Sequence, residues 1–248
     1  MSLKRIVAQF CVAVELLTRI PMPQTLIHKS ELSFAVWAYP VVGIFVGLWG
    51  GLLGSLAVFI GLPMSFAACI AILGMTLITG GLHEDGLADT VDALGGIRSV
   101  PEMLRIMKDS TLGTYGVLAI AFTLMIRGSL IAALPDGRAI LISCIVAGAV
   151  SRSWIGLFMS TLPLLKQTGI AASIGRPPIF LGIISCLIAV SVAIFLGGIE
   201  VAIAACLVTL LYGWYIKKKI GGYTGDIIGA GQQLTEAASL CFLVLSYQ

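Results

Sequence analysis

Residues 38–61 read AYPVVGIFVGLWGGLLGSLAVFIG, a stretch of twenty-four residues with no charged side chain. An α-helix rises about 1.5 Å per residue, so this run is long enough to cross the roughly 30 Å hydrocarbon core of a membrane. Similar runs recur along a chain that is 58% hydrophobic and only 11% charged. Soluble domains carry about 25% charged residues. The sequence therefore predicts an all-α, polytopic integral membrane helical bundle.

We expect about seven transmembrane helices and one further helix before them. Residues 3–20 place charged and apolar side chains at helical spacing, which is typical of an amphipathic helix at the membrane surface, within an interfacial segment 1–32. The last span is short, and both a full crossing and a partly re-entrant course are open for it. The predicted spans are 34–60, 63–79, 111–134, 139–161, 178–197, 200–216 and 233–247.

The distribution of cations predicts the orientation in the membrane. With the N-terminus in the cytoplasm, twelve of the fifteen Lys and Arg residues fall on the cytoplasmic side. These are Lys4, Arg5, Arg19, Lys29, Arg98, Arg105, Lys108, Lys166, Arg176, Lys217, Lys218 and Lys219. We therefore expect a multi-pass protein of the cytoplasmic (inner) membrane with its C-terminus outside. The formal charge of +3 gives no reason to expect a nucleic-acid partner.

The chain shows no internal repeat and no second soluble domain, so residues 1–248 are interpreted as a single transmembrane catalytic domain. Glycines at four-residue spacing in the first span, Gly43, Gly47 and Gly51, predict close helix packing. Two cytoplasmic segments carry the chemistry, an acidic motif within 80–110 and a Gly-rich loop at 217–232.

The acidic motif reads GGLHEDGLADTVD at residues 80–92. Glycine pairs bracket a predicted helix over 84–94, on which Asp85, Asp89 and Asp92 fall at i, i+4 and i+7 and share one face. A capping box, Ser99-Val100-Pro101-Glu102, predicts a second short helix over 100–109.

Carboxylates at this spacing repel one another, so a cation is expected beside them. One interpretation is a solvated acidic face neutralised by nearby Arg and Lys. The other, which the glycine brackets favour, is a Mg²⁺ site formed by Asp85, Asp89 and Asp92, with Glu84 as a weaker ligand. Mg²⁺ commonly joins one or two carboxylates to substrate phosphates, which predicts phosphoryl-transfer chemistry. Gly86 would let a phosphate approach the backbone.

Three further features fit the same chemistry. His83 is a candidate general acid or base, although it could equally hydrogen-bond a carboxylate. Lys108, in KDSTLGTYG at 108–116, is a candidate partner for a diphosphate. An arginine inside a span is costly and usually faces a polar cavity, so Arg152 is a predicted phosphate partner.

The Gly-rich loop GGYTGD at 221–226 follows three lysines and offers backbone N–H groups to an anion. Asp226 is a candidate base or metal ligand. Thr224, Gly225 and, further along, Gln232 are the predicted substrate-binding residues of this segment.

Together, LLTRIPMP, AYPVVGIFVG, TGGLHEDGLADTVDALGG, RIMKDSTLGTYGVLA and GGYTGDIIGAGQQLTEAASL resemble the adenosylcobinamide-GDP ribazoletransferases, the cobalamin (5′-phosphate) synthases, in the same order from about residue 10 to the C-terminus. The resemblance implies Mg²⁺-dependent joining of adenosylcobinamide-GDP to α-ribazole or its 5′-phosphate, with release of GMP. His83 or Asp226 would then take the hydroxyl proton, and Lys108 and Arg152 would neutralise the diphosphate.

The resemblance also implies membrane lipid as surroundings, and it leaves open a homo-oligomer and an association with other cobalamin-assembly enzymes. The DGLAD core is partly similar to the signature of CDP-alcohol phosphotransferases, which is the alternative activity. An Asp-rich prenyltransferase would need a second acidic motif. A transporter would carry its acids near the bilayer midplane and show repeats, so it is the least favoured interpretation.

Overall fold

The computed structural model describes residues 2–26, 29–109, 111–166 and 168–248, and regular structure in these ranges is helical apart from one isolated bridge between Leu164 and Tyr223. Among the described residues, six helices or continuous helix pairs are long and apolar enough to cross a membrane, and a bent pair, α3 with α4, makes a seventh if it counts as one span. The predicted all-α, multi-pass bundle is confirmed.

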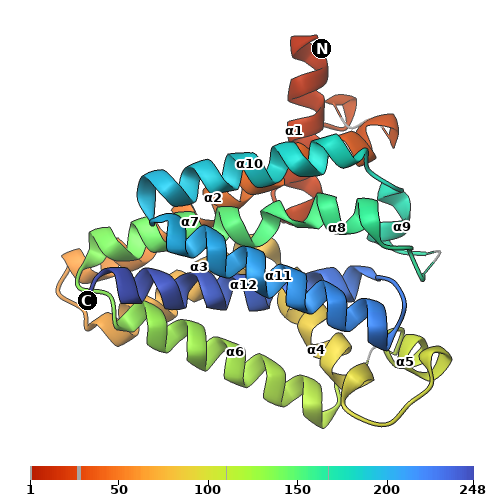
Figure 1. The fold of residues 1–248 in the computed structure, drawn as a ribbon. Helices are drawn as coiled ribbons and strands as arrows, with labels where there is room; N and C mark the ends of the chain where they lie inside the picture. Colours follow the sequence, from red (N-terminus) through yellow and green to blue (C-terminus); the bar gives the residue numbers. More distant parts are fainter. Residues whose placement is uncertain (1, 27–28, 110, 167) are drawn as a thin grey trace.

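The long helices lie roughly side by side and pack along their length (Figure 1). Two of the six spans consist of two joined elements. The span Glu31–Phe59 joins a 3₁₀ segment to α2, and the span Gly137–Thr161 joins α7 to α8. The bounds are η2 Lys29–Ala38 with α2 Tyr39–Phe59, α6 Thr114–Ala132, α7 Gly137–Ser153 with α8 Ile155–Thr161, α10 Ile179–Leu196, α11 Ile199–Lys219 and α12 Gly225–Ser246.

The glycine stripe of the first span packs α2 against α7, as predicted. A Cβ atom at Gly43 would overlap the carbonyl oxygen of Gly148, and one at Gly47 would overlap that of Cys144. Only hydrogen side chains let the two backbones come this close. These glycines hold the bundle together and have no part in the chemistry.

Helix α1, Leu3–Leu17, lies crosswise to the long helices (Figure 1). This orientation suits a helix along the membrane surface. Its second half is nevertheless packed inside, since Val12 and Ala13 are fully buried against η2 and α2. Gln9 donates a hydrogen bond to Glu31 and accepts one from Trp37, which ties α1 to the start of the first span. A short η1, Gln24–Leu26, follows it.

Helix α3, Met64–Thr79, ends at Gly80 and Gly81, whose φ angles of +69° and +70° favour glycine. The chain there turns by 89° into α4, Leu82–Leu94, which confirms the predicted helix over the acidic motif. Helix α4 carries four carboxylates and an imidazole in thirteen residues, so we place it outside the membrane-spanning segments. It packs against α12 and α6.

The predicted capping box begins α5, Val100–Ile106, where both Ser99–Glu102 hydrogen bonds form. This helix ends three residues before the predicted end at 109. The remaining short helix, α9, covers Ile170–Ile174.

The C-terminal part of the chain differs from the prediction. Helix α12 begins at Gly225, so the expected loop over 217–232 is confined to the few residues between α11 and α12, and the last span is full length. Thr224 caps the helix by accepting a hydrogen bond from the N–H of Ile227. The segment GDIIGAGQQ has the small and polar residues of a loop, but in the structure these residues are largely buried against other helices. Helix α12 can therefore span the membrane without being apolar all round.

Candidate functional site

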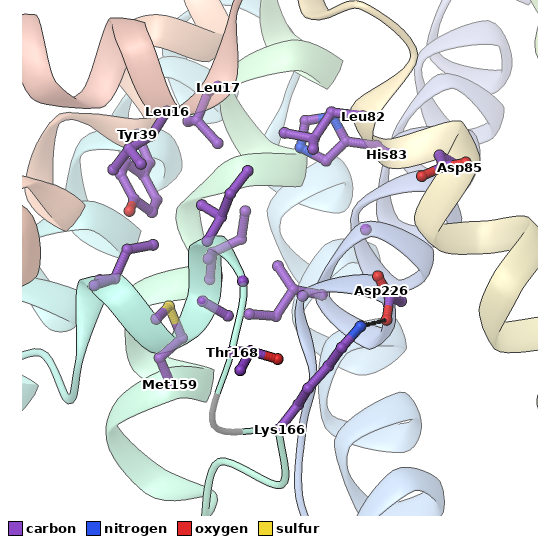
Figure 2. A pocket seen from close by; sticks show the side chains of 18 residues that line it. Leu16, Leu17, Tyr39, Leu82, His83, Asp85, Met159, Lys166, Thr168 and Asp226 are labelled. Carbon is purple, nitrogen blue, oxygen red and sulfur yellow. Dashed lines mark ion pairs between the residues drawn. The ribbon is translucent and has the colours of Figure 1, made fainter. Parts of the chain in front are cut away.

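A narrow cavity of about 250 Å³ lies between α1, α2, α4, α8, α9 and α12 (Figure 2). One wall is polar and carries His83 and Asp85 from α4, Asp226 from α12 and Lys166 from the α8–α9 connection. The other walls are almost entirely aliphatic. The cavity thus places a few charged groups at the edge of an apolar space, which is the usual composition of a small-molecule site.

A wider cavity of about 740 Å³ lies beside the narrow one. Charged residues line it, among them Asp89, Lys108 and Asp109. The two cavities share Asp85 and Lys166, so these side chains stand where a ligand in one space would meet a ligand in the other.

Acidic groups from two helices gather at this junction. Burial raises the pKa of the Asp89 carboxyl to about 6, the negative charges of Asp226 and Asp85 act in the same direction, and Lys166 opposes them. The Lys166 Nζ atom lies 3.6 Å from Oδ2 of Asp226. The two cavities are lined by four carboxylates and two lysines, so negative charge is in excess and the junction is attractive to a cation.

The predicted carboxylate face of α4 is split in the structure. Asp85 and Asp89 line cavities, whereas Asp92 is buried and accepts hydrogen bonds from the N–H groups of Gly113 and Gly116 at 2.8 and 2.9 Å. These glycines begin α6, so Asp92 caps that helix and offsets its dipole. In the structure both carboxylate oxygens of Asp92 are therefore engaged by the start of α6.

Glu84, the weaker predicted ligand, belongs to a buried ion network. Its Oε1 atom lies 3.1 Å from Arg127, and Glu236 lies 2.5 Å from Arg127 and 3.4 Å from Arg152. Both arginines are at most 2% exposed. Gln232 donates a hydrogen bond of 2.6 Å to Glu236.

This network includes two of the predicted substrate-binding residues. Arg152 and Gln232 were expected to contact substrate, but neither lines the narrow or the wider cavity. The polar surroundings that an intramembrane arginine requires come instead from the glutamates of α4 and α12.

Gly86, the predicted point of approach for a phosphate, lies where α4 crosses α12. A Cβ atom there would lie 2.8 Å from the carbonyl oxygen of Asp226, so this glycine lets α4 and α12 cross closely. The crossing brings Asp85 and Asp226 to one cavity. Thr224 is fully buried as the cap of α12 and does not line the cavity, whereas Gly225, the first residue of α12, does.

His83, Asp226 and Lys108, the predicted catalytic residues, all reach the cavities. Burial, with the nearby charges of Arg152 and Arg127, holds the pKa of the His83 imidazole well below its usual value. His83 is therefore neutral near pH 7, and the same burial and positive charges oppose protonation of its ring.

Two residues that line the narrow cavity have no role predicted from the sequence. Lys166 counted only as a cytoplasmic cation, because nothing near it in the chain distinguishes it from other loop lysines. Tyr39 opens the first span and was part of a motif without an assigned role, yet its side chain lines the narrow cavity (Figure 2).

Metal binding by protein groups alone is not supported, since within the described ranges no three His, Cys, Asp or Glu side chains are arranged to hold an ion. Mg²⁺, however, is commonly held by one or two carboxylates together with substrate phosphates. Asp85, Asp89 and Asp226 offer the hard oxygen donors that this mode requires.

Comparisons with known proteins agree on one family. The family described as cobalamin-5-phosphate synthase matches residues 9–244. The adenosylcobinamide-GDP ribazoletransferase of Mesorhizobium japonicum is 35% identical over 97% of this chain and 94% of its own. Proteins of the same name from Rhizobium johnstonii and Shewanella frigidimarina are 37% and 36% identical, over 93% and 95% of this chain and 94% and 93% of theirs. No solved structure matches the chain.

Proposed function

The chain belongs to the cobalamin-5-phosphate synthase family, and from this premise we propose that the two cavities meeting at Asp85 are its catalytic site. The protein is an adenosylcobinamide-GDP ribazoletransferase. It joins adenosylcobinamide-GDP to α-ribazole, or to its 5′-phosphate, and releases GMP. The observation that carries the site is that Asp85 lines both cavities, as a two-substrate transfer requires.

The reaction exchanges a phosphoanhydride bond for a phosphoester bond. A ribazole hydroxyl attacks the phosphorus that bears the cobinamide, a new O–P bond forms, and the bond to the phosphate of GMP breaks. The hydroxyl proton passes to a base, and the bridging electron pair leaves with GMP. Charge therefore builds up on the phosphate oxygens, and the protein has to stabilise it.

The residues at the cavity junction suit these tasks. Asp85, Asp89 and Asp226 would hold Mg²⁺, which would neutralise the diphosphate and its leaving group when bound. His83 borders the narrow cavity, whereas Asp226 is already paired with Lys166, so His83 is the base that we favour. Lys166 and Lys108 both line the wider cavity and would supply positive charge toward the phosphates.

The end of the bundle that holds the two cavities also holds α4, α5, α9 and the α11–α12 connection (Figure 1). Arg105 lies on α5, and seven further cations lie in the adjoining connections or at the end of α11: Arg98, Lys108, Lys166, Arg176, Lys217, Lys218 and Lys219. Because cytoplasmic segments are rich in Lys and Arg, this end would face the cytoplasm, where nucleotide-linked substrates are found, and the N-terminus would lie on the same side.

A reconstituted assay tests the proposal. The protein in liposomes receives adenosylcobinamide-GDP, α-ribazole 5′-phosphate and Mg²⁺, and GMP and corrinoid product are followed by chromatography. We expect equal amounts of both from the wild type, and a loss of at least ~100-fold for Asp85→Asn, since a metal-binding carboxylate stabilises transition-state charge. Glu200→Gln, a matched change in the first turn of α11 at the opposite end, should turn over normally.

Full turnover by Asp85→Asn at low Mg²⁺ would refute the site. A folded wild type that yields no GMP, but transfers a phosphoalcohol from CDP-linked donors, would refute the activity in favour of a CDP-alcohol phosphotransferase.

A further inference from the structure

The narrow cavity has two ends of different chemistry. His83, Asp85 and Asp226 lie on one side, and Tyr39 lies on the opposite side (Figure 2). Between them the walls are apolar, with contributions from Leu16, Leu17, Ile155, Met159, Ile174 and Ile228. A ligand that fills this space needs a flat or compact apolar body, a reactive polar group at one end and a hydrogen-bonding atom at the other.

Tyr39 gives independent evidence of a ligand. Its side chain is 1% exposed, and within the described part of the chain its hydroxyl has no hydrogen-bond partner. Buried hydroxyls in folded proteins are almost always hydrogen-bonded, because losing water without replacement is costly. A phenylalanine would fill the same wall without this cost, so the hydroxyl points to a polar atom on a bound molecule.

The cavity volume separates the two substrates. At about 250 Å³ the narrow cavity falls below the roughly 300–1,000 Å³ of pockets for drug-sized ligands, and a corrin ring cannot enter it. The neighbouring cavity of about 740 Å³ is wider and charged, which suits a diphosphate attached to a large macrocycle. An aromatic nitrogen base has the shape and chemistry that the narrow cavity requires.

We infer that the narrow cavity binds the aromatic base of the ribazole acceptor, with the Tyr39 hydroxyl hydrogen-bonded to the free ring nitrogen. The inference rests on the proposed function and extends it to the acceptor subsite. The base lies among the aliphatic side chains, and the ribose points toward His83 and Asp85. The donor diphosphate occupies the wider cavity, and the reacting atoms meet at the wall that Asp85 and Lys166 share.

Kinetics with both substrates varied test this assignment. Tyr39→Phe should raise the KM for α-ribazole about fivefold, the effect of one neutral hydrogen bond, and leave the KM for adenosylcobinamide-GDP unchanged. Its apo protein should be at least as stable as the wild type, because the lost hydroxyl has no partner. Tyr247→Phe, the same change in an exposed residue at the end of the chain, should alter neither constant.

A second variant narrows the cavity without touching the hydroxyl. Ala171 on α9 is buried and lines the cavity, so Ala171→Leu should raise the KM for α-ribazole at least ~10-fold. The loss should be smaller for a riboside of unsubstituted benzimidazole, whose base is less bulky. If both variants leave the acceptor KM unchanged, or raise the donor KM equally, the assignment is overturned.

Direct binding separates this inference from the proposed function. Equilibrium dialysis with labelled α-ribazole and no donor should show binding to the wild type that Tyr39→Phe and Ala171→Leu weaken. If the protein binds α-ribazole in this way but releases no GMP in the reconstituted assay, the acceptor site is supported and the transfer reaction is refuted. GMP release with unchanged α-ribazole affinity in both variants would keep the reaction and refute the site.

Discussion

Replacing Glu236 by Gln should destabilise the protein more than any exposed substitution. Glu236 is 1% exposed and lies 2.5 Å from Arg127 and 3.4 Å from Arg152. With Glu84 it balances the two arginines, so the buried network has no net charge. The substitution keeps the shape of the side chain but leaves a net charge of one unit buried in the bundle.

The size of the effect follows from this imbalance. Breaking a buried ion pair by removing one partner costs about 3–5 kcal/mol. In a chain of this length about 2–4 °C of Tm corresponds to 1 kcal/mol, so a loss of about 3 kcal/mol lowers the Tm by about 6–12 °C. Removing a positive charge as well restores neutrality. The double variant Glu236→Gln/Arg152→Gln should therefore lose less than the sum of the two single variants.

Thermal unfolding in detergent, followed by tryptophan fluorescence, measures these shifts for the two single variants, the double variant and the exposed control Glu200→Gln. A Tm of Glu236→Gln within about 2 °C of the wild type would show that the glutamate does not neutralise the arginines. Strictly additive losses in the double variant would also contradict the network, since independent sites add.

Three further outcomes follow from the site. Asp92→Asn should cost about 2 kcal/mol of stability, because the Asp92 carboxylate accepts hydrogen bonds from two backbone N–H groups of α6. The Mg²⁺ concentration that the variant requires should stay that of the wild type. A normal Tm with a raised Mg²⁺ requirement would instead make Asp92 a ligand. Because the pKa of Asp89 is raised to about 6, protons compete with the metal below that pH, and the apparent Mg²⁺ affinity should fall as the pH drops through about 6. A Mg²⁺ affinity that does not change between pH 7 and pH 5 would contradict this. Gly86→Ala should lower the Tm by an amount equivalent to about 1–3 kcal/mol and should reduce turnover. The new Cβ atom would lie 2.8 Å from the carbonyl oxygen of Asp226 and would push α4 away from α12. An unchanged Tm would show that the crossing tolerates the methyl group.

The sequence alone was sufficient for the features that depend on local pattern. Uninterrupted apolar runs determine membrane-spanning helices whatever they pack against, because the bilayer core leaves the backbone no other hydrogen-bonding partner. Likewise, the glycine pair before α4 and the capping box of α5 act within a few residues, and both helices begin close to where the pattern placed them. The motifs around the acidic segment also identified the family that the comparisons support.

Residue roles, in contrast, depended on partners distant in the chain. Glu236 meets Arg152 across 84 positions and Arg127 meets Glu84 across 43, and these contacts, absent from any local pattern, turn expected ligands into a buried network. Asp92 follows Asp89 by three residues and so belongs to the same predicted helix face as Asp85 and Asp89, yet its carboxylate binds the start of α6 and does not line a cavity. The polar sequence of α12 resembled a loop because hydropathy does not record which helices face one another.

The narrow cavity itself was beyond sequence reasoning. Its walls come from six helices and one connection, and the roles of Tyr39 and Lys166 exist only where those elements converge. The sequence thus determined a membrane bundle with an acidic, phosphate-handling motif, because hydrophobicity, capping and charge spacing act locally. Only the tertiary structure decided which of the acids face the cavities and which are neutralised in the interior, because burial and pairing are set by side chains far apart in the chain.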